Sequence, residues 1–255
     1  MNFFDSHAHY NDDTFENNRD ELIKKMYENE ITNIVCAGYS LEKSKLGIEI
    51  AKKHNHIYAT CGISPNDLTD NTKEELKEIE KIAKNDKVVA IGEIGLDYYW
   101  NKDNKEYQKE MFANQIEIAN RLNLPIVIHS RDAWVDTIDI LKNNPVNKKG
   151  IFHCCQLNQE LIKEALKLDF YISFSGNITF KNAKSAGCIL LVPDNRILIE
   201  TDSPYLSPEP LRGTVNNSLN VKLVAKKIAE VKNMELEEVA NITRKNAMNI
   251  FNIKE

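Results

Sequence analysis

The sequence predicts an α/β fold, namely a single (β/α)₈ barrel of the TIM type with an additional C-terminal helix. Its 255 residues suit one large α/β domain. Eight short apolar runs alternate with helical patterns along the chain, as they do in such a barrel. Neither a linker nor a low-complexity segment interrupts this alternation. We therefore expect residues 1–255 to form one domain.

The eight apolar runs have the length and the nearly continuous hydrophobicity of parallel strands that are buried on both faces. We expect these strands at residues 3–7, 33–37, 57–63, 88–93, 125–129, 150–153, 170–174 and 196–200.

Helical patterns occupy the connections, because apolar residues recur there at spacings of three and four. The clearest groups are Leu22, Ile23 and Met26; Leu76, Ile79 and Ile82; Phe112, Ile116 and Ala119; and Leu161, Ile162, Ala165 and Leu166. Two closing helices are expected at residues 221–231 and 236–251. An open doubly wound sheet is the alternative fold. It often carries a glycine-rich phosphate loop, and no G-x-G-x-x-G or Walker A pattern occurs here.

Composition narrows the class of protein. No basic and apolar leader and no apolar run of membrane-spanning length is present, so we expect a cytoplasmic protein without membrane association. The five cysteines are odd in number and form no C-x-x-C pair, which indicates free thiols. A net charge of -5 argues against a module that coats nucleic acid, but an enzyme can still bind one phosphodiester through metal ions. No obligate protein partner is evident.

Metal-ligand residue types gather at the carboxyl ends of the predicted strands. In a TIM-type barrel those ends form the face that carries the active site. The residues are His7, His9, Glu93, His129, His153 and Asp202. Four imidazoles and two carboxylates favour zinc, manganese, iron or nickel over calcium or magnesium alone. Six ligands exceed one tetrahedral site, so the sequence predicts two divalent ions per chain, joined by a bridging carboxylate.

A second H-x-H pattern, His54 and His56, lies at the amino end of the third predicted strand. That end faces away from the expected active site, so we interpret these two histidines as surface residues.

Six motifs, in order, carry a resemblance to a known family. They are DSHAH at 5–9, GEIGLDYY at 92–99, HSRDA at 129–133, FHC at 152–154, SFSG at 173–176 and ETDSPYL at 200–206. With them the chain resembles the TatD-like metal-dependent deoxyribonucleases of the amidohydrolase superfamily along its whole length. The resemblance implies a divalent-metal hydrolase with 3′–5′ exonuclease activity on DNA.

The resemblance also implies how the ligands divide between two metals. His7, His9, Glu93 and Asp202 would hold one metal, and Glu93, His129 and His153 the other. The metal could be zinc, manganese, nickel or magnesium.

The sequence departs from the family pattern in loops over the same face. The family usually has G-x-H-P-H after the third strand, whereas residues 62–66 read GISPN, with Ser64 and Asn66 at the histidine positions. Residues 154–157 read CCQL, and residues 214–215 replace a basic pair. These changes bear on substrate binding rather than on the predicted metal ligands.

Two arginines are candidates for substrate binding. Arg131 directly follows His129 and Ser130 and could clamp a phosphate, or could form a salt bridge with Asp132 or with a carboxylate at a helix start. Arg212 lies in the loop after the eighth strand, a common phosphate-binding region of barrels. Trp100 and the tyrosines before it could stack on a base or pack within their own loop.

The expected substrate is DNA or another phosphodiester, attacked by a metal-activated water. Asp202 is the expected proton acceptor, and Glu93 is the other catalytic candidate. The same ligands would also serve an amidase, an esterase or a lactonase, including an enzyme that deacylates aminoacyl-tRNA. A non-catalytic metal-binding relative is a further alternative. A Ser-His-Asp esterase is disfavoured because no G-x-S-x-G elbow occurs.

Overall fold

Eight parallel strands follow one another around the structure in the order of the chain, from β1 to β8. The structure is a computed structural model and describes residues 1–254. The strands are β1 (Phe3–Ala8), β2 (Ile31–Cys36), β3 (Ile57–Cys61), β4 (Val88–Asp97), β5 (Ile126–Arg131), β6 (Gly150–Phe152), β7 (Tyr171–Phe174) and β8 (Ile197–Ile199). This order, with a helix in each connection, is that of the predicted TIM-type barrel.

Contacts between β1 and the end of β8 bring the two edges of the sheet together, so the barrel is nearly closed. The amide of Asp202 donates to the carbonyl of His7 at 3.0 Å, and the amide of His9 donates to the carbonyl of Ser203 at 2.7 Å. Both bonds lie at the carboxyl ends of the strands. They therefore attach the loop after β8 directly to His7, in β1, and to His9, just after it.

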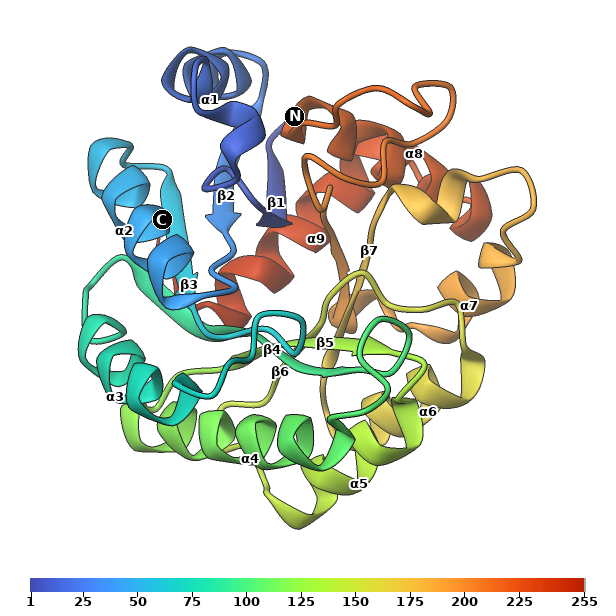
Figure 1. The fold of residues 1–255 in the computed structure, drawn as a ribbon. Helices are drawn as coiled ribbons and strands as arrows, with labels where there is room; N and C mark the ends of the chain where they lie inside the picture. The colour runs from blue at the N-terminus through green and yellow to red at the C-terminus, as the bar shows by residue number, and fades with distance from the viewer. Residues whose placement is uncertain (255) are drawn as a thin grey trace.

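Helices form a layer around the strands (Figure 1). They are α1 (Arg19–Glu28), α2 (Leu41–Lys53), α3 (Thr72–Ile82), α4 (Lys105–Leu122), α5 (Trp134–Asn143), α6 (Gln159–Lys167), α7 (Ser185–Leu191), α8 (Val221–Lys232) and α9 (Leu236–Ile250). The two closing helices were predicted, whereas α2, α5 and α7 had not been singled out. Among the described residues, no helix combines the length and the apolar character needed to cross a bilayer.

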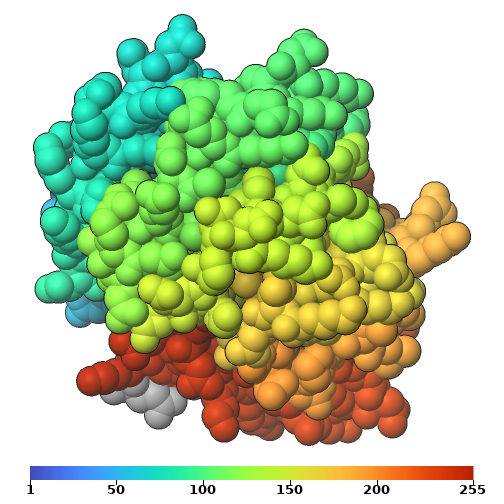
Figure 2. Space-filling view, turned by 90° about the horizontal axis from the view of Figure 1, so that it is seen from below, coloured from blue at the N-terminus to red at the C-terminus, as the bar shows by residue number. Residues whose placement is uncertain are grey.

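Helix α9 packs across the amino end of the barrel. Ala247, Met248 and Phe251 belong to one buried cluster with early strand residues such as Phe4 and Val35. The rings of Phe4 and Phe251 stack with their centroids 6.1 Å apart. In the space-filling view, the C-terminal segment, in red, gathers along the lower end of the molecule (Figure 2). With this end covered, the opposite face is the open one.

Strand β4 is longer than the sequence suggested, which corrects the predicted position of Glu93. The expected strand ended at Glu93, but β4 continues to Asp97. The added residues pair with β5, which itself continues past His129 to Arg131. Glu93 therefore lies inside β4, at a register shift between Ile91 and Ile94, rather than at its end.

Candidate metal centre

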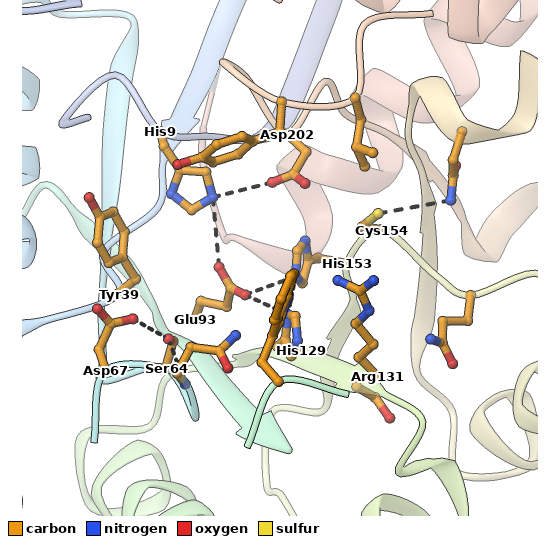
Figure 3. Close-up of a pocket in the computed structure, with 17 residues that line it drawn as sticks. His9, Tyr39, Ser64, Asp67, Glu93, His129, Arg131, His153, Cys154 and Asp202 are labelled. Atoms are coloured by element: carbon orange, nitrogen blue, oxygen red, sulfur yellow. Dashed lines mark hydrogen bonds and ion pairs between the residues drawn. The ribbon is translucent and has the colours of Figure 1, made fainter. Parts of the chain in front are cut away.

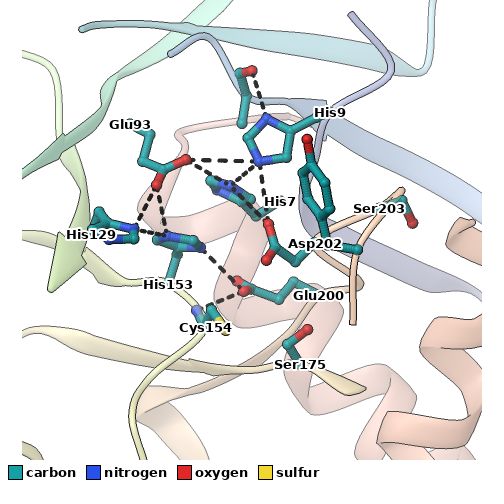
Figure 4. A network of polar contacts seen from close by, with 12 residues as sticks. His7, His9, Glu93, His129, His153, Cys154, Ser175, Glu200, Asp202 and Ser203 are labelled. Carbon is teal, nitrogen blue, oxygen red and sulfur yellow. Dashed lines mark hydrogen bonds and ion pairs between the residues drawn. The ribbon is translucent and has the colours of Figure 1, made fainter. Parts of the chain in front are cut away.

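The structure brings all six predicted ligand residues together at the carboxyl face of the barrel (Figure 4). They form three overlapping groups whose ligand atoms lie within 4.8 Å of one another. The groups are His7, His9 and Glu93; Glu93, His129 and His153; and His7, His153 and Asp202. The first two groups share Glu93, as a bridged two-metal site requires.

Glu93 lies between two pairs of histidines. Its Oε2 atom is 3.4 Å from His7 Nε2 and 3.7 Å from His9 Nε2. Its Oε1 atom is 2.8 Å from His129 Nδ1 and 3.2 Å from His153 Nε2. One carboxylate oxygen for each pair of imidazoles is the arrangement expected of a bridging ligand.

Asp202 lies beside the first pair of histidines, His7 and His9. Its Oδ1 atom lies 3.2 Å from His9 Nε2 and 3.7 Å from His7 Nε2. The Asp202 side chain is 14% exposed, against 9% for Glu93, so of the two carboxylates it is the more open to the pocket.

Two of the imidazoles are oriented through the ring nitrogen that faces away from the centre. His129 Nε2 lies 2.9 Å from Asp97 Oδ2, and His9 Nδ1 lies 3.3 Å from the carbonyl oxygen of Ala37. A hydrogen bond of this kind fixes the tautomer, so that the other ring nitrogen offers its lone pair to a metal.

Glu200 lies beside the imidazole of His153, which in turn stacks on that of His7. The rings of His7 and His153 stack with centroids 4.0 Å apart. His153 Nδ1 is 3.4 Å from Glu200 Oε1, which also accepts a 2.6 Å hydrogen bond from the amide of Cys154. Glu200 is fully buried. No role was predicted for Asp97 or Glu200, although both are carboxylates inside the motifs that contain ligands.

The donor set fits a cation. Nitrogen atoms of different rings face each other at 3.2 Å between His7 and His9, and at 3.4 Å between His129 and His153. The Nδ1 atom of His7, on the side of the ring that faces away from the centre, is buried without a hydrogen-bond partner. Converging imidazole lone pairs repel unless a proton or a metal ion lies between them. Imidazole and carboxylate ligands suit zinc and similar divalent ions.

The buried carboxylates Glu93 and Glu200 stabilise positive charge on the histidines of this centre. Burial tends to raise the pKa of Glu93, but the charge of His153 and hydrogen bonds from the surrounding imidazoles hold it well below its usual range. Burial also opposes the charge of His153, yet Glu93 and Glu200 raise its pKa well above the ordinary value. Divalent ions can supply the same positive charge in place of imidazole protons.

A pocket of about 710 Å³ is lined by five of the six residues, namely His9, Glu93, His129, His153 and Asp202 (Figure 3). Arg131 and Trp100 line it together with Asp202. The Arg131 guanidinium lies 3.9 Å above the ring of Tyr99, and it forms no ion pair with any carboxylate of residues 1–254. The alternative that Arg131 forms a salt bridge with Asp132 or with a carboxylate at a helix start is therefore not what the structure shows. This leaves a cation free to meet an anionic substrate.

A family model described as TatD-related DNase matches residues 4–252. The chain belongs to the TatD-related DNase family. It is 43% identical to YabD of Bacillus subtilis, described as an uncharacterized metal-dependent hydrolase, over 98% of this chain and 99% of that one. The structure of a TatD-family hydrolase from Entamoeba histolytica is 25% identical, with a TM-score of 0.87 over 98% of each chain. The fold is also that of YjjV, a TatD homologue of Escherichia coli, with a TM-score of 0.92 and 24% identity over 99% of this chain and 98% of that one.

The two positions at which this TatD-family chain lacks the expected histidines also line the pocket. Ser64 donates a hydrogen bond to Asp67. Asn66 donates to Asp97 Oδ2 at 3.1 Å and accepts from Asn101 at 3.0 Å. These side chains therefore shape the wall of the pocket, and Asn66 touches the carboxylate that orients His129.

The remaining candidates lie apart from the centre. Arg212 is exposed, with its guanidinium 3.6 Å above the ring of Phe180, and it does not line the pocket among the described residues. His54 and His56 lie at the amino end of β3, as expected. Both are only half-buried, and His54 Nε2 is 2.9 Å from Asp20.

Proposed function

We propose that the substrate of this metal-dependent hydrolase is DNA, cleaved at phosphodiester bonds from a 3′ end. The observation that carries the proposal is the six-residue centre with Glu93 at its middle, beneath a pocket that presents the unpaired cation of Arg131. The family to which the chain belongs supports a nucleic-acid substrate. The direction of cleavage rests on the resemblance to characterised members.

We propose that all six residues hold two divalent ions. Bound there, such ions would lower the pKa of water and neutralise charge on a phosphoryl oxygen. Glu93 has both oxygens directed at histidines, so its role is to hold the two halves of the centre together. Asp202 lines the pocket and presents its Oδ1 atom beside His9. We therefore assign to Asp202 the proton that leaves the attacking water, with Glu93 as the other candidate.

Arg131 is suited to bind a phosphate next to the scissile bond. A guanidinium offers paired N–H donors that match two phosphate oxygens. The guanidinium carbon lies 3.9 Å from the centre of the Tyr99 ring, and this cation–π contact leaves its N–H groups available for such bonds. Arg212, outside the pocket, could contact only a longer substrate.

A substrate panel tests this function with protein reconstituted in zinc or manganese. It contains single-stranded DNA, DNA whose 3′-terminal linkages are phosphorothioates, RNA and an aryl phosphodiester. It also contains an aryl ester, a lactone and an aminoacyl-tRNA. We expect cleavage of DNA from its free 3′ end, slowed by the blocked end, and no cleavage by a His129→Ala variant. Turnover of only the ester, the lactone or the aminoacyl-tRNA would contradict the proposal and show that the protein is an acyl hydrolase.

A further inference from the structure

Asp97 contacts the metal centre through one of its carboxylate oxygens. Its Oδ2 atom lies 2.9 Å from His129 Nε2 and accepts a 3.1 Å hydrogen bond from Asn66. His129 Nδ1, on the other side of the ring, faces Glu93 at 2.8 Å. The position of the Asp97 carboxylate therefore sets both the tautomer and the tilt of His129.

The other oxygen of Asp97 holds the turn that follows β4. Its Oδ1 atom accepts hydrogen bonds from the amides of Tyr99 and Trp100, both at 2.9 Å. The backbone of Asp97 is fixed as well. Its amide donates to Gln108 Oε1 at 2.8 Å, and its carbonyl accepts from Gln108 Nε2 at 3.1 Å. Asp97 is fully buried, so its carboxylate has little freedom to relax when either set of partners moves.

The turn held by Asp97 forms part of the pocket. Tyr99 stacks beneath the Arg131 guanidinium, and its ring meets the Trp100 ring edge to face at 4.8 Å. Trp100 is 66% exposed and lines the pocket. The amide of Tyr98 donates to the carbonyl of Arg131 at 2.9 Å, so the turn and the arginine are joined by backbone as well.

We infer that Asp97 is a positioning residue that couples the occupancy of the metal position at His129 to the geometry of the Tyr99–Trp100 turn. This inference rests on the metal-dependent function proposed above. A metal that fixes His129 fixes the Asp97 carboxylate, which in turn fixes the two amides of the turn. Coupling of this kind is reciprocal, so an ordered turn also favours metal binding at His129.

Position 97 requires a carboxylate because the partners of both of its oxygens are hydrogen-bond donors. His129 Nε2–H and Asn66 face one oxygen, and the amides of Tyr99 and Trp100 face the other. An asparagine at position 97 has one acceptor and one donor. It can therefore satisfy only one side and places N–H against N–H on the other.

The first test uses an otherwise unchanged chain. Trp134→Phe leaves Trp100 as the remaining tryptophan, because the sequence contains two. Zinc is added to chelated protein while Trp100 emission and zinc binding are followed together. We expect Trp100 emission to shift as the centre fills. Zinc binding without any change in Trp100 emission would overturn the coupling and leave the proposed function intact. Absence of zinc binding would overturn both.

The second test compares two carboxylate-to-amide variants in the same background. In Asp97→Asn we expect zinc affinity at one site to fall about 10- to 100-fold, and Trp100 emission to stop responding even at saturating zinc. Asp136→Asn is the matched control. Asp136 Oδ2 accepts a 2.6 Å hydrogen bond from Tyr98 in the same turn but does not contact His129. The zinc affinity of Asp136→Asn and the response of its Trp100 emission should remain those of the parent. Parent-like zinc affinity in Asp97→Asn, or equal losses in the two variants, would contradict the inference.

Discussion

Asp202 has a left-handed backbone conformation, which aspartate adopts more readily than most residues other than glycine and asparagine. Its φ is 56°, in the left-handed region. Its amide is bonded to the carbonyl of His7, and its own carbonyl accepts a hydrogen bond from the amide of Tyr205. These bonds aim the carboxylate at the same point as the β1 histidines.

The proposed role of Asp202 as a base leads to a prediction for Asp202→Asn. Asparagine keeps the size and one oxygen of the side chain but is a poor proton acceptor. The variant should keep much of its metal and lose at least about 10²-fold in kcat. Both quantities are measured on one sample. Near-normal turnover at full metal occupancy would instead assign the proton to another group, with Glu93 the first candidate.

Substitution of Arg131 and substitution of Arg212 should affect substrate cleavage differently. Loss of charge-assisted hydrogen bonds to phosphate in Arg131→Ala should lower kcat/KM about 10- to 100-fold on both an aryl phosphodiester and DNA, with metal content unchanged. Arg212→Ala should affect only DNA long enough to leave the pocket. Kinetics on the two substrates decide this. Unchanged kinetics for Arg131→Ala would remove that residue from the site.

Sequence patterns were sufficient to predict which residues meet, because parallel strands bring their carboxyl ends to one face. Asp97 and Glu200 escaped notice for a different reason. Their roles depend on which atom of His129 or His153 faces away from the centre, and no spacing in a sequence encodes that. The cation–π contact between Arg131 and Tyr99 could not be predicted from the sequence either, since it depends on the extended pairing of β4 with β5.

At the scale of elements, strand existence was predictable and strand length was not. The run 88–93 signals a buried strand, but Ile94 to Asp97 extend it through backbone pairing with β5. Gly95 is needed in that extension because its φ is 139° and a Cβ there would meet the carbonyl oxygen of His129 at 2.0 Å. Helix α7 has only seven residues, too few for a clear 3.6-residue pattern.

The connection between α2 and β3 provides a test of acid stability. Burial, together with the neighbouring charges of His54 and Lys87, lowers the pKa of His56 from 6.5 to about 4, and Tyr27 lies against its ring. Between those two values the unfolded chain binds more protons than the folded one. The contribution of His56 to stability is therefore lost as the pH falls from 6.5 toward 4.

His56→Phe keeps a ring at this position and removes the titration. Its free energy of unfolding should fall less steeply with acid across that window than the parent's. The difference should stay well below about 1.4 kcal/mol per pH unit, because the side chain is partly exposed and screened. Denaturant unfolding at several pH values measures both slopes. Parallel slopes for the two proteins would contradict the assignment.

At the scale of the whole molecule, the metal centre joins segments from both ends of the chain. Ligand residues come from β1 and from the loop after β8, and α9 closes the opposite end of the barrel. We propose that residues 1–255 unfold as one domain. Removal of metal should then lower the Tm of the entire chain rather than melt a part of it.

Calorimetry with and without a chelator checks this expectation. Each site filled at about 100 times its Kd adds about 2.7 kcal/mol to the free energy of unfolding. A His7→Ala, His9→Ala double variant should gain less from added metal than the parent. Two separate transitions in the parent would contradict the single domain.

The most direct test of the account is the metal content of the purified chain. Elemental analysis is carried out after saturation with zinc or manganese and removal of free ion. We expect about two ions per chain, and about one in the His7→Ala, His9→Ala double variant, because Glu93, His129 and His153 still form a complete group. No more than a fraction of an ion per chain in the parent would contradict the claim that these six residues form a two-metal centre.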